Sequence, residues 1–415
     1  MTKLLVVEDS EFFSSVIKQF VQRDLGIEVV TAANMALAET AIAENDGEFF
    51  LALLDLNLPD APSGEVVDAV LAHRIPSVVF TATFNDEVRE EILPKGVVDY
   101  ILKDNTSSIE YVVALVRRLF RNRDIKVLAV DDSAVERKML TYLLEQSQFQ
   151  VFTAENGKQG LQVLKEHPDI KLIVTDYYMP EMDGFDLIRN VRKTYSRAGL
   201  SIIGISAKGT QAISAKFIKF GANDFINKPF LKEEFFWRVN QNVEMIEQFE
   251  RLERAANWDY LTGLPNRRQF FAKGARLFEA ASKEESKLSV AILDVDRFKL
   301  INDTYGHDVG DAVLKQIGEF LGAQVSDNDI AARLGGEEFC LLVSDMSETQ
   351  LKLYMERVRT GIETATFGTD EQKVSVTISI GVCVEISETL GEMMAIADTM
   401  LYQAKEQGRN RVLLQ

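Results

Sequence analysis

Short continuous apolar runs alternate with amphipathic stretches along the chain up to about residue 240. The run at 172–175 is LIVT, whereas residues 133–146 carry apolar side chains at the spacing of one helix face. Continuous apolar strands that alternate with helices are typical of a parallel sheet covered on both faces. The pattern therefore predicts an α/β fold with doubly wound parallel sheets.

This pattern occurs twice. KLLVVEDS at 3–10 matches KVLAVDDS at 126–133, and each match begins a similar series of apolar runs. Four pairs of matching positions are separated by 121 to 125 residues: Asp9 and Asp132, Asp55 and Asp176, Thr81 and Ser206, and Lys103 and Lys228. A nearly constant offset of this length indicates a duplicated domain, because the period is too long for a solenoid repeat.

Each copy places acids, a hydroxyl and a lysine at the predicted carboxyl ends of its strands, where parallel sheets form their sites. These residues are Glu8, Asp9, Asp55, Thr81 and Lys103 in the first copy, and Asp131, Asp132, Asp176, Ser206 and Lys228 in the second. Clustered carboxylates favour a divalent cation such as Mg²⁺, and a hydroxyl with a lysine can hold phosphoryl oxygens. The alternative is acids that serve only the turns, and the recurrence of the whole set argues against it.

Both copies resemble response-regulator receiver domains, which have a flavodoxin-like fold. The resemblance implies that a histidine kinase or a phosphotransfer protein phosphorylates Asp55 and Asp176. It also implies roles for the other residues of each set. Mg²⁺ would be held by Glu8, Asp9 and Asp55, and by Asp131, Asp132 and Asp176; the phosphoryl group would contact Thr81 and Lys103, and Ser206 and Lys228; Tyr100 and Phe225 match the switch aromatic. The first copy departs from the family at Asp104, where the second has Pro229.

A long helix is predicted after the second copy, because no Gly or Pro occurs from Leu231 to Leu261. Its apolar residues form one stripe: Phe236, Val239, Val243, Ile246, Phe249 and Leu252. Two interpretations stay open. The helix either ends the second copy with a solvated tail, or pairs with its twin and carries a signal forward.

The last 160 residues hold a different set of motifs, beginning with DYLTGLPNRR at 259–268. An apolar strand from 288 runs directly into Asp294, and RLGGEEFCLLV at 333–343 runs through a turn into a second strand. A third strand is predicted at 374–384, and a helix at 397–412. If the first two strands lie side by side, Asp294 meets Glu337 beside two glycines, which suggests a metal site with room for a ligand.

Polar groups for such a ligand are available near these motifs. Lys299, Lys405 and Arg409 are the cations that a polyphosphate needs, with the last two expected one helical turn apart. Asn302 and Asp311 can hydrogen-bond a guanine edge, because a carboxylate accepts two N–H bonds. Arg333 is expected to steady the hairpin, and Asp303 and His307 are expected to be structural.

Together these motifs resemble those of the GGDEF family of diguanylate cyclases, with GGEEF as a variant of the motif that names the family. The resemblance implies that two GTP molecules are joined into cyclic di-GMP with release of two pyrophosphates. Asp294, the carbonyl of Val295 and Glu337 would ligate Mg²⁺ or Mn²⁺, with Glu338 assisting. Lys299, Lys405 and Arg409 would bind phosphates, Asn302 and Asp311 would select guanine, and Gly335 and Gly336 would leave the turn bare.

Composition and charge limit which ligands and which cellular compartment are expected for this protein. The net charge of −18 disfavours binding to nucleic acid, which is itself a polyanion. Cys340 and Cys383 lie in apolar runs, as in a protein of a reducing compartment. No signal sequence and no membrane span are predicted, so we expect the cytoplasm. The domains are expected at 1–123, 124–240 and 258–415, with a signalling helix at 241–257.

A phosphorylation-regulated diguanylate cyclase that acts as a homodimer is therefore predicted. The alternative is a catalytically silent protein that binds nucleotide and relays phosphorylation to a partner; a different purine dinucleotide product is a second one. Many family members have R-x-x-D before the motif as a site for product inhibition. Here Asp329 is present, but Ser326 stands at the arginine position, so weak inhibition is expected.

Overall fold

The computed structural model describes residues 2–45, 47–82, 86–104, 106–207, 211–284, 286–326 and 328–415. The chain divides into two compact units, Met1–Glu250 and Arg251–Gln415. In the described part of the chain, no helix combines the length and apolar character that crossing a membrane requires.

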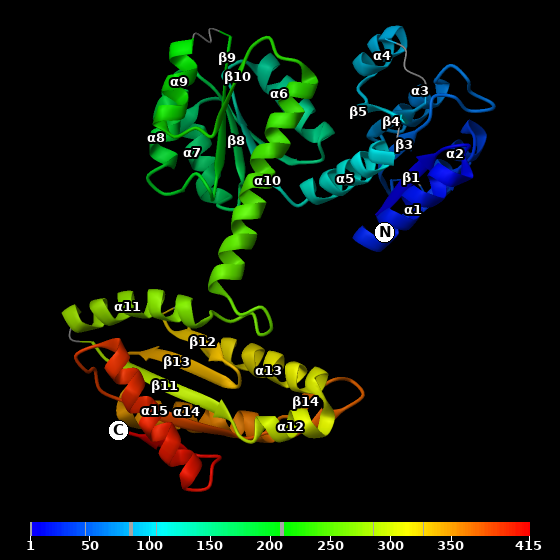
Figure 1. Cartoon of the computed structure of the whole chain (residues 1–415). Coiled ribbons are helices and arrows are strands. Elements are labelled where there is room, and N and C mark those ends of the chain that lie inside the picture. Colours follow the sequence, from blue (N-terminus) through cyan, green and yellow to red (C-terminus); the bar gives the residue numbers. More distant parts are fainter. Residues whose placement is uncertain are drawn as a thin grey trace. The chain divides into compact units, whose positions relative to one another are not determined.

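The first copy forms a five-stranded sheet in the order β2-β1-β3-β4-β5, with every neighbouring pair parallel. Its strands are β1 (Lys3–Val7), β2 (Glu28–Ala32), β3 (Phe49–Leu54), β4 (Ser77–Thr81) and β5 (Asp99–Leu102). Its helices are α1 (Glu11–Leu25), α2 (Met35–Glu44), α3 (Glu65–Ala72), α4 (Asp86–Ile92) and α5 (Thr106–Asn122), with a short 3₁₀ turn at Leu93–Lys95. One core lies under α2 and α3 and a second under α1 and α5, so both faces of the sheet are covered, as predicted (Figure 1).

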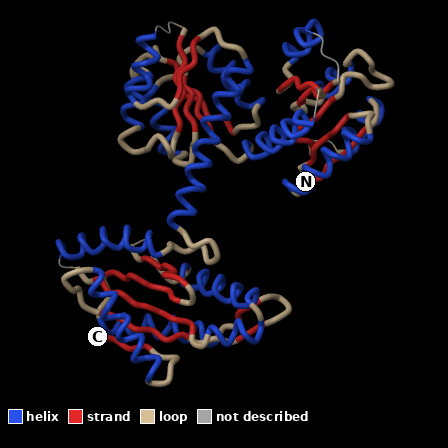
Figure 2. Tube along the Cα trace, viewed as in Figure 1, coloured by secondary structure: helices blue, strands red, loops and turns tan. Residues whose placement is uncertain are grey.

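The second copy repeats this topology, in the order β10-β9-β8-β6-β7 with all pairs parallel. Its strands are β6 (Lys126–Val130), β7 (Gln150–Ala154), β8 (Leu172–Asp176), β9 (Ser201–Ser206) and β10 (Asp224–Asn227). Its helices are α6 (Ala134–Gln146), α7 (Gly157–Glu166), α8 (Gly184–Val191), α9 (Gln211–Phe220) and α10 (Lys232–Asn257). Figure 2 shows these helices on both faces of the sheet, and the duplication read from the sequence is confirmed.

Helix α10 begins as the last helix of the second copy. Val239, Val243 and Ile246 are buried, as the predicted stripe requires. Beyond Ile246 the apolar residues of the stripe are no longer buried: Phe249 is 45% exposed and Leu252 is 70% exposed. Apolar side chains thus continue along α10 beyond the core that its first half completes.

Residues 251–415 form a sheet in the order β12-β13-β11-β16-β17. Its strands are β11 (Leu288–Val295), β12 (Ile330–Gly335), β13 (Glu338–Ser344), β16 (Ile378–Cys383) and β17 (Val412–Leu414), with a small separate hairpin of β14 (Phe367–Gly368) and β15 (Lys373–Val374). Its helices are α11 (Arg267–Glu284), α12 (Phe298–Tyr305), α13 (His307–Gly322), α14 (Glu348–Thr364) and α15 (Leu390–Glu406). One core includes residues of α13 and α14 and the other residues of α11 and α15, so this α+β domain also has both sheet faces covered.

Two predicted elements of this domain are shorter than the sequence suggested. Of the strand expected at 374–384, only β16 (Ile378–Cys383) pairs continuously with its neighbours in the main sheet. The helix expected at 397–412 ends at Glu406, because Gly408, Arg409 and Asn410 have φ of 115°, 65° and 46°. Left-handed residues cannot continue a right-handed helix, so Arg409 lies in a loop and not one helical turn beyond Lys405.

Candidate functional site

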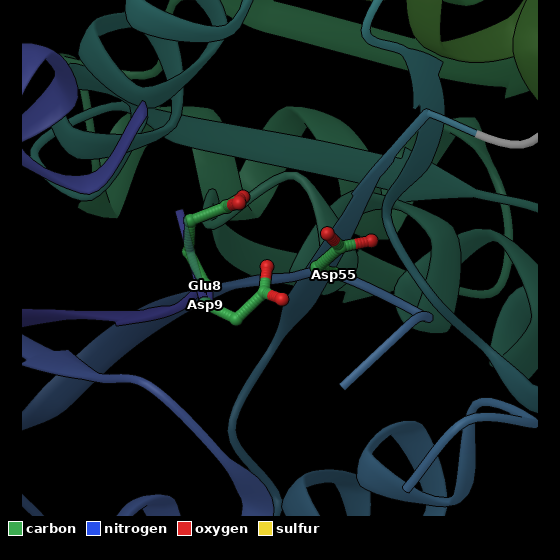
Figure 3. Close-up of side chains that lie close together, drawn as sticks. All are labelled: Glu8, Asp9 and Asp55. Carbon is green, nitrogen blue, oxygen red and sulfur yellow. The ribbon is translucent and has the colours of Figure 1, made fainter. Parts of the chain in front are cut away.

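The acids of the first copy converge at the carboxyl ends of β1 and β3. Carboxylate oxygens of Glu8, Asp9 and Asp55 all lie within 4.8 Å of one another (Figure 3). Glu8 and Asp55 are buried, and burial raises the pKa of the Glu8 carboxyl above its ordinary value. Three oxygen donors at this spacing fit a hard divalent cation, which would offset their desolvation and mutual repulsion.

Lys103 closes this site from the end of β5. Its Nζ lies 2.5 Å from Glu8 and 2.6 Å from Asp55, and its side chain is 3% exposed. The backbone N–H of Lys103 donates to the carbonyl of Thr81, a buried residue at the end of β4. Asp104 in place of proline therefore does not move the lysine away from the acids. Tyr100 is half-buried on β5.

The second copy gathers the corresponding residues at the ends of its own strands. Lys228 Nζ lies 3.2 Å from Asp131 and 3.4 Å from Asp176, and Ser206 is buried at the end of β9. Burial raises the pKa of the Asp176 carboxyl. Asp132 is exposed, and the acids of this copy do not close to the spacing of the first within the part of the chain that the structure describes. Phe225 is buried on β10.

One acid at this second site was missed by the sequence analysis. Glu136, in the first turn of α6, lies 3.0 Å from Lys228 Nζ. The first copy has Phe13 at the matching position, 123 residues earlier, which is also the offset from Asp9 to Asp132. Comparing the two copies position by position would have exposed this difference, although the contact with Lys228 depends on the fold.

In the third sheet, β11 and β13 pair antiparallel, which confirms the predicted side-by-side arrangement. Asp294 lies directly opposite Glu338, and the N–H of Val295 donates to the carbonyl of Glu337 at 3.3 Å. Asp294 is buried, and burial raises the pKa of its carboxyl. Lys405 opposes this shift, and the charges of Glu337 and Glu338 add to it. The charges favour a cation here for the same reason as at the first sheet.

The turn between β12 and β13 depends on its two glycines. Gly335 and Gly336 have φ of 146° and 52°, which L side chains rarely adopt, and a Cβ on either would meet nothing within 4 Å. The turn is therefore bare and open. Arg333 donates two bonds to the carbonyl of Gly336 and one to Asp259. It thus steadies the hairpin as predicted and ties it to the DYLTGLPNRR segment.

The three predicted cations are placed differently. Lys405 Nζ lies 2.8 Å from Asp294, so the last turn of α15 reaches the acids. Lys299, on α12, and Arg409, in the loop after α15, are both exposed. Their charges are available at the surface of the domain, whereas Lys405 is already beside the candidate metal ligands.

Asn302 and Asp311 come from neighbouring helices, α12 and α13. A Cβ on Gly310 would lie 1.9 Å from the Asn302 amide oxygen, so glycine here leaves room for the Asn302 side chain against α13. Asp311 is the next residue after Gly310 and is exposed. The fold therefore brings the two predicted base-recognition residues to one helix junction.

Asp296 is a second residue that the sequence analysis missed. Its buried carboxylate accepts bonds from the hydroxyls of Thr377 and Ser379, both at 2.7 Å. It also accepts a bond from the N–H of Asn410 at 3.1 Å, in the loop that carries Arg409. Asp296 thus fixes the left-handed loop against the sheet. The motif DVD at 294–296 places this second acid two residues after Asp294, which could have suggested that it also has a role.

Ser326 and Asp329 contact each other within one turn. The Ser326 hydroxyl and N–H donate to one oxygen of Asp329 at 2.6 and 3.2 Å, and the N–H of Ser344 donates to the other at 2.9 Å. Both oxygens of Asp329 therefore have local partners.

Two family models match this chain. The model described as "Response regulator receiver domain" matches residues 4–113 and 127–240, and that described as "Diguanylate cyclase, GGDEF domain" matches 256–411. The chain belongs to the response-regulator receiver family and carries a C-terminal GGDEF domain.

Individual relatives agree with this assignment. The probable diguanylate cyclase DgcT of Escherichia coli (strain K12) is 39% identical over 196 residues, covering 43% of this chain and 43% of DgcT. The response regulator PleD of Caulobacter vibrioides is 28% identical over 308 residues, covering 69% of this chain and 65% of PleD. This chain therefore spans less than two thirds of either relative.

A solved structure is similar over a larger share of its own length. It is described as a putative two-component system response regulator/GGDEF domain protein, is 41% identical and has a TM-score of 0.54. The match covers 60% of this chain and 100% of that one. This chain is therefore similar, over 60% of its length, to a known structure described as a response regulator/GGDEF domain protein.

Proposed function

We propose that this protein is a phosphorylation-regulated diguanylate cyclase, which condenses two GTP into cyclic di-GMP and two pyrophosphates. The observation that carries the proposal is the arrangement at the β12–β13 turn. There, Asp294 faces Glu338 across the sheet beside two glycines that leave the backbone open, and Lys405 contacts Asp294. The GGDEF family match over 256–411 supports the same reaction.

In this proposal the acids hold a divalent metal, Mg²⁺ or Mn²⁺. Asp294, the Val295 carbonyl and Glu337 are its ligands, and the donor set of oxygens suits either ion. The metal supplies Lewis-acid stabilisation of the phosphate charge. Glu338 assists, either by accepting the proton of the ribose 3′-hydroxyl or by positioning the metal.

The remaining residues of the domain bind and orient the nucleotide. Lys405, Lys299 and Arg409 neutralise phosphate oxygens, which stabilises charge that develops as pyrophosphate leaves. Asn302 and Asp311 hydrogen-bond the guanine edge from the junction of α12 and α13. Gly335 and Gly336 let the nucleotide lie against the turn backbone.

Ring closure requires a second active site, because each site holds one GTP. A homodimer therefore brings two GGDEF domains together, and the exposed apolar residues of α10 fit a helix that pairs with its twin. We divide the chain into receivers at 1–123 and 124–240, a signalling helix at 241–257 and the cyclase domain at 258–415.

The two receivers control that pairing in the proposal. Asp55 and Asp176 accept a phosphoryl group from a histidine kinase or a phosphotransfer protein, with Mg²⁺ held by the neighbouring acids. Lys103 with Thr81, and Lys228 with Ser206, contact the phosphoryl oxygens, and Tyr100 and Phe225 respond to it. The catalytically silent adaptor is not favoured, because every catalytic and metal residue of the GGDEF pattern is present in the chain.

Product analysis tests the proposal directly. The full chain is incubated with GTP and Mg²⁺, with and without beryllofluoride as a phosphate mimic. Cyclic di-GMP and pyrophosphate in a ratio of one to two, formed faster with the mimic, are the expected result. Binding of GTP without any product would favour the silent adaptor, and a different dinucleotide would overturn the assignment of guanine recognition.

A further inference from the structure

The two receivers differ in what surrounds their matching lysines, Lys103 and Lys228. In the first, Lys103 Nζ lies 5.1 Å from the ring centre of Phe13 and contacts two carboxylates. In the second, Lys228 is shared among three carboxylates, those of Asp131, Glu136 and Asp176. Position for position, an apolar ring has been replaced by a negative charge.

Glu136 competes with the two site acids for this lysine. Its distance to Lys228 Nζ is 3.0 Å, shorter than the 3.2 and 3.4 Å to Asp131 and Asp176. In the first receiver, where this competitor is absent, the corresponding distances are 2.5 and 2.6 Å. The Oε2 atom of Glu136 that faces the lysine is buried, while the Glu136 side chain as a whole is 37% exposed, so water screens this pair only in part.

An incoming phosphoryl group needs that same ammonium group. To contact the phosphoryl oxygens, Lys228 has to leave Glu136, whose charge then remains close to a ligand of the same sign. Like charges at such a distance repel, and the repulsion is larger at a buried site than at an exposed one. Phe13 imposes neither cost on the first receiver.

We propose that Glu136 lowers the affinity of the second receiver for a phosphoryl group by holding Lys228. It is a positioning residue, since it acts through the lysine. The inference rests on the proposed function, in which Asp176 is the acceptor, and it makes the two receivers unequal: the first binds the phosphate mimic at lower concentration than the second.

The test is a beryllofluoride titration of the full chain with Mg²⁺, read by ¹⁹F NMR of the bound mimic. Asp55→Asn silences the first receiver, so that only Asp176 is titrated. Adding Glu136→Gln, which keeps the shape and removes the charge, should tighten binding about tenfold, or about 1.4 kcal/mol. Phe13→Glu in an Asp176→Asn background should weaken binding at the first receiver by a similar factor.

A matched control is available on the same helix. Glu145 is exposed near the other end of α6, nine residues and therefore about 13 Å further along the axis. Glu145→Gln removes the same charge from the chain, and should leave affinity within about twofold, the scale expected for an exposed charge at this distance.

The outcomes distinguish a failure of the inference about Glu136 from a failure of the proposed acceptor roles of Asp55 and Asp176. If Glu136→Gln leaves affinity unchanged, or if Glu145→Gln tightens binding equally, Glu136 has no special hold on Lys228 and the inference falls alone. If the mimic still binds when Asp55→Asn and Asp176→Asn are combined, the acceptor assignment itself is wrong. A Glu136→Asp variant that behaves like wild type would support charge as the cause.

Discussion

The receiver sites and the proposed cyclase site hold their lysines in different ways. Lys103 follows a strand of its own sheet, contacts two carboxylates and is 3% exposed. Lys405 lies on the last turn of a helix, contacts one carboxylate and is 32% exposed. Lys103 is therefore enclosed by the acids of its site, whereas Lys405 is partly open to solvent beside the bare turn.

This difference bears on how control and chemistry are divided. In the proposed function, the enclosed receiver site responds to a single phosphoryl group, because binding must rearrange the few contacts that Lys103 makes with its acids. The cyclase site has its bare turn of Gly335 and Gly336 open, so in the proposed function a second copy completes it. Variants at the two kinds of site should therefore fail in different ways, and four predictions test this.

Glu337→Gln should have the largest effect. The variant loses a charged metal ligand at the cyclase site, so turnover should fall by more than about tenfold, or about 1.4 kcal/mol of transition-state stabilisation. The measurement is the initial rate of pyrophosphate release from GTP. Beryllofluoride binding at the receivers serves as the control and should be unchanged. A variant that retains more than about a tenth of the rate would remove Glu337 from the metal site.

Ser326→Arg tests whether product inhibition can be introduced at the surface of the cyclase domain. Serine carries no charge, and Asp329 already has local partners for both oxygens, so wild type should show little inhibition by low micromolar cyclic di-GMP. Arginine adds a bidentate charged donor, typically about 1.5–3 kcal/mol. Product affinity should rise roughly ten- to a hundredfold.

The measurement is initial pyrophosphate release against added product for both proteins. Strong inhibition of wild type that Asp329→Ala abolishes would show that another cation completes a product site. Control would then lie in the cyclase domain as well as in the receivers.

Asp55→Asn and Asp176→Asn sharpen the comparison within the receivers. Each should reduce activation of the cyclase by beryllofluoride, because the amide cannot bind the mimic as the carboxylate does. The loss should be greater for Asp55, and activity without the mimic provides the baseline. A variant that activates like wild type would identify its receiver as a scaffold.

Asp294→Asn should have the smallest effect, on stability without metal. Burial holds the Asp294 pKa above its usual 3.8, so the folded protein gains stability as pH falls from neutral through that raised pKa. The neutral amide lacks this dependence, and Lys405 is exposed enough to be solvated. At neutral pH with a chelator the variant should therefore be the more stable protein in urea.

The advantage should shrink as pH is lowered. Glu8→Gln provides the receiver counterpart, since burial raises that pKa as well. If Asp294→Asn destabilises the chelated protein at neutral pH, the contact with Lys405 outweighs the burial of the charge, and the cyclase site resembles the receivers more closely than proposed.

Much of this molecule is determined locally in the sequence. The buried runs of β1, β3 and β11 are apolar at consecutive positions, so their strand character follows from composition, and acids that directly follow a strand must lie at its end. The open turn follows as directly, because Gly335 and Gly336 adopt backbone angles that favour glycine. The duplication needed only a comparison of the chain with itself.

Other features depend on the tertiary structure. Glu136 and Lys228 are far apart in sequence, and only the packing of α6 against the sheet brings them together. Asp296 gains its role from Thr377, Ser379 and Asn410, each on a segment remote in the chain. Contacts of this kind arise from long-range packing, to which a residue's own neighbours in sequence give no clue.

The end of α15 depends both on local sequence and on tertiary contacts. Helical periodicity extends past Lys405, and nothing in QGRNRV except one glycine opposes it. The loop forms because Asp296 and Arg359 bind the backbone and side chain of Asn410, which holds adjacent residues in left-handed conformations. Sequence determined which cations are present. The tertiary structure decided that Lys405 contacts Asp294 while Arg409 lies in a loop, since partly buried hydrogen bonds to Asn410 offset a local backbone preference.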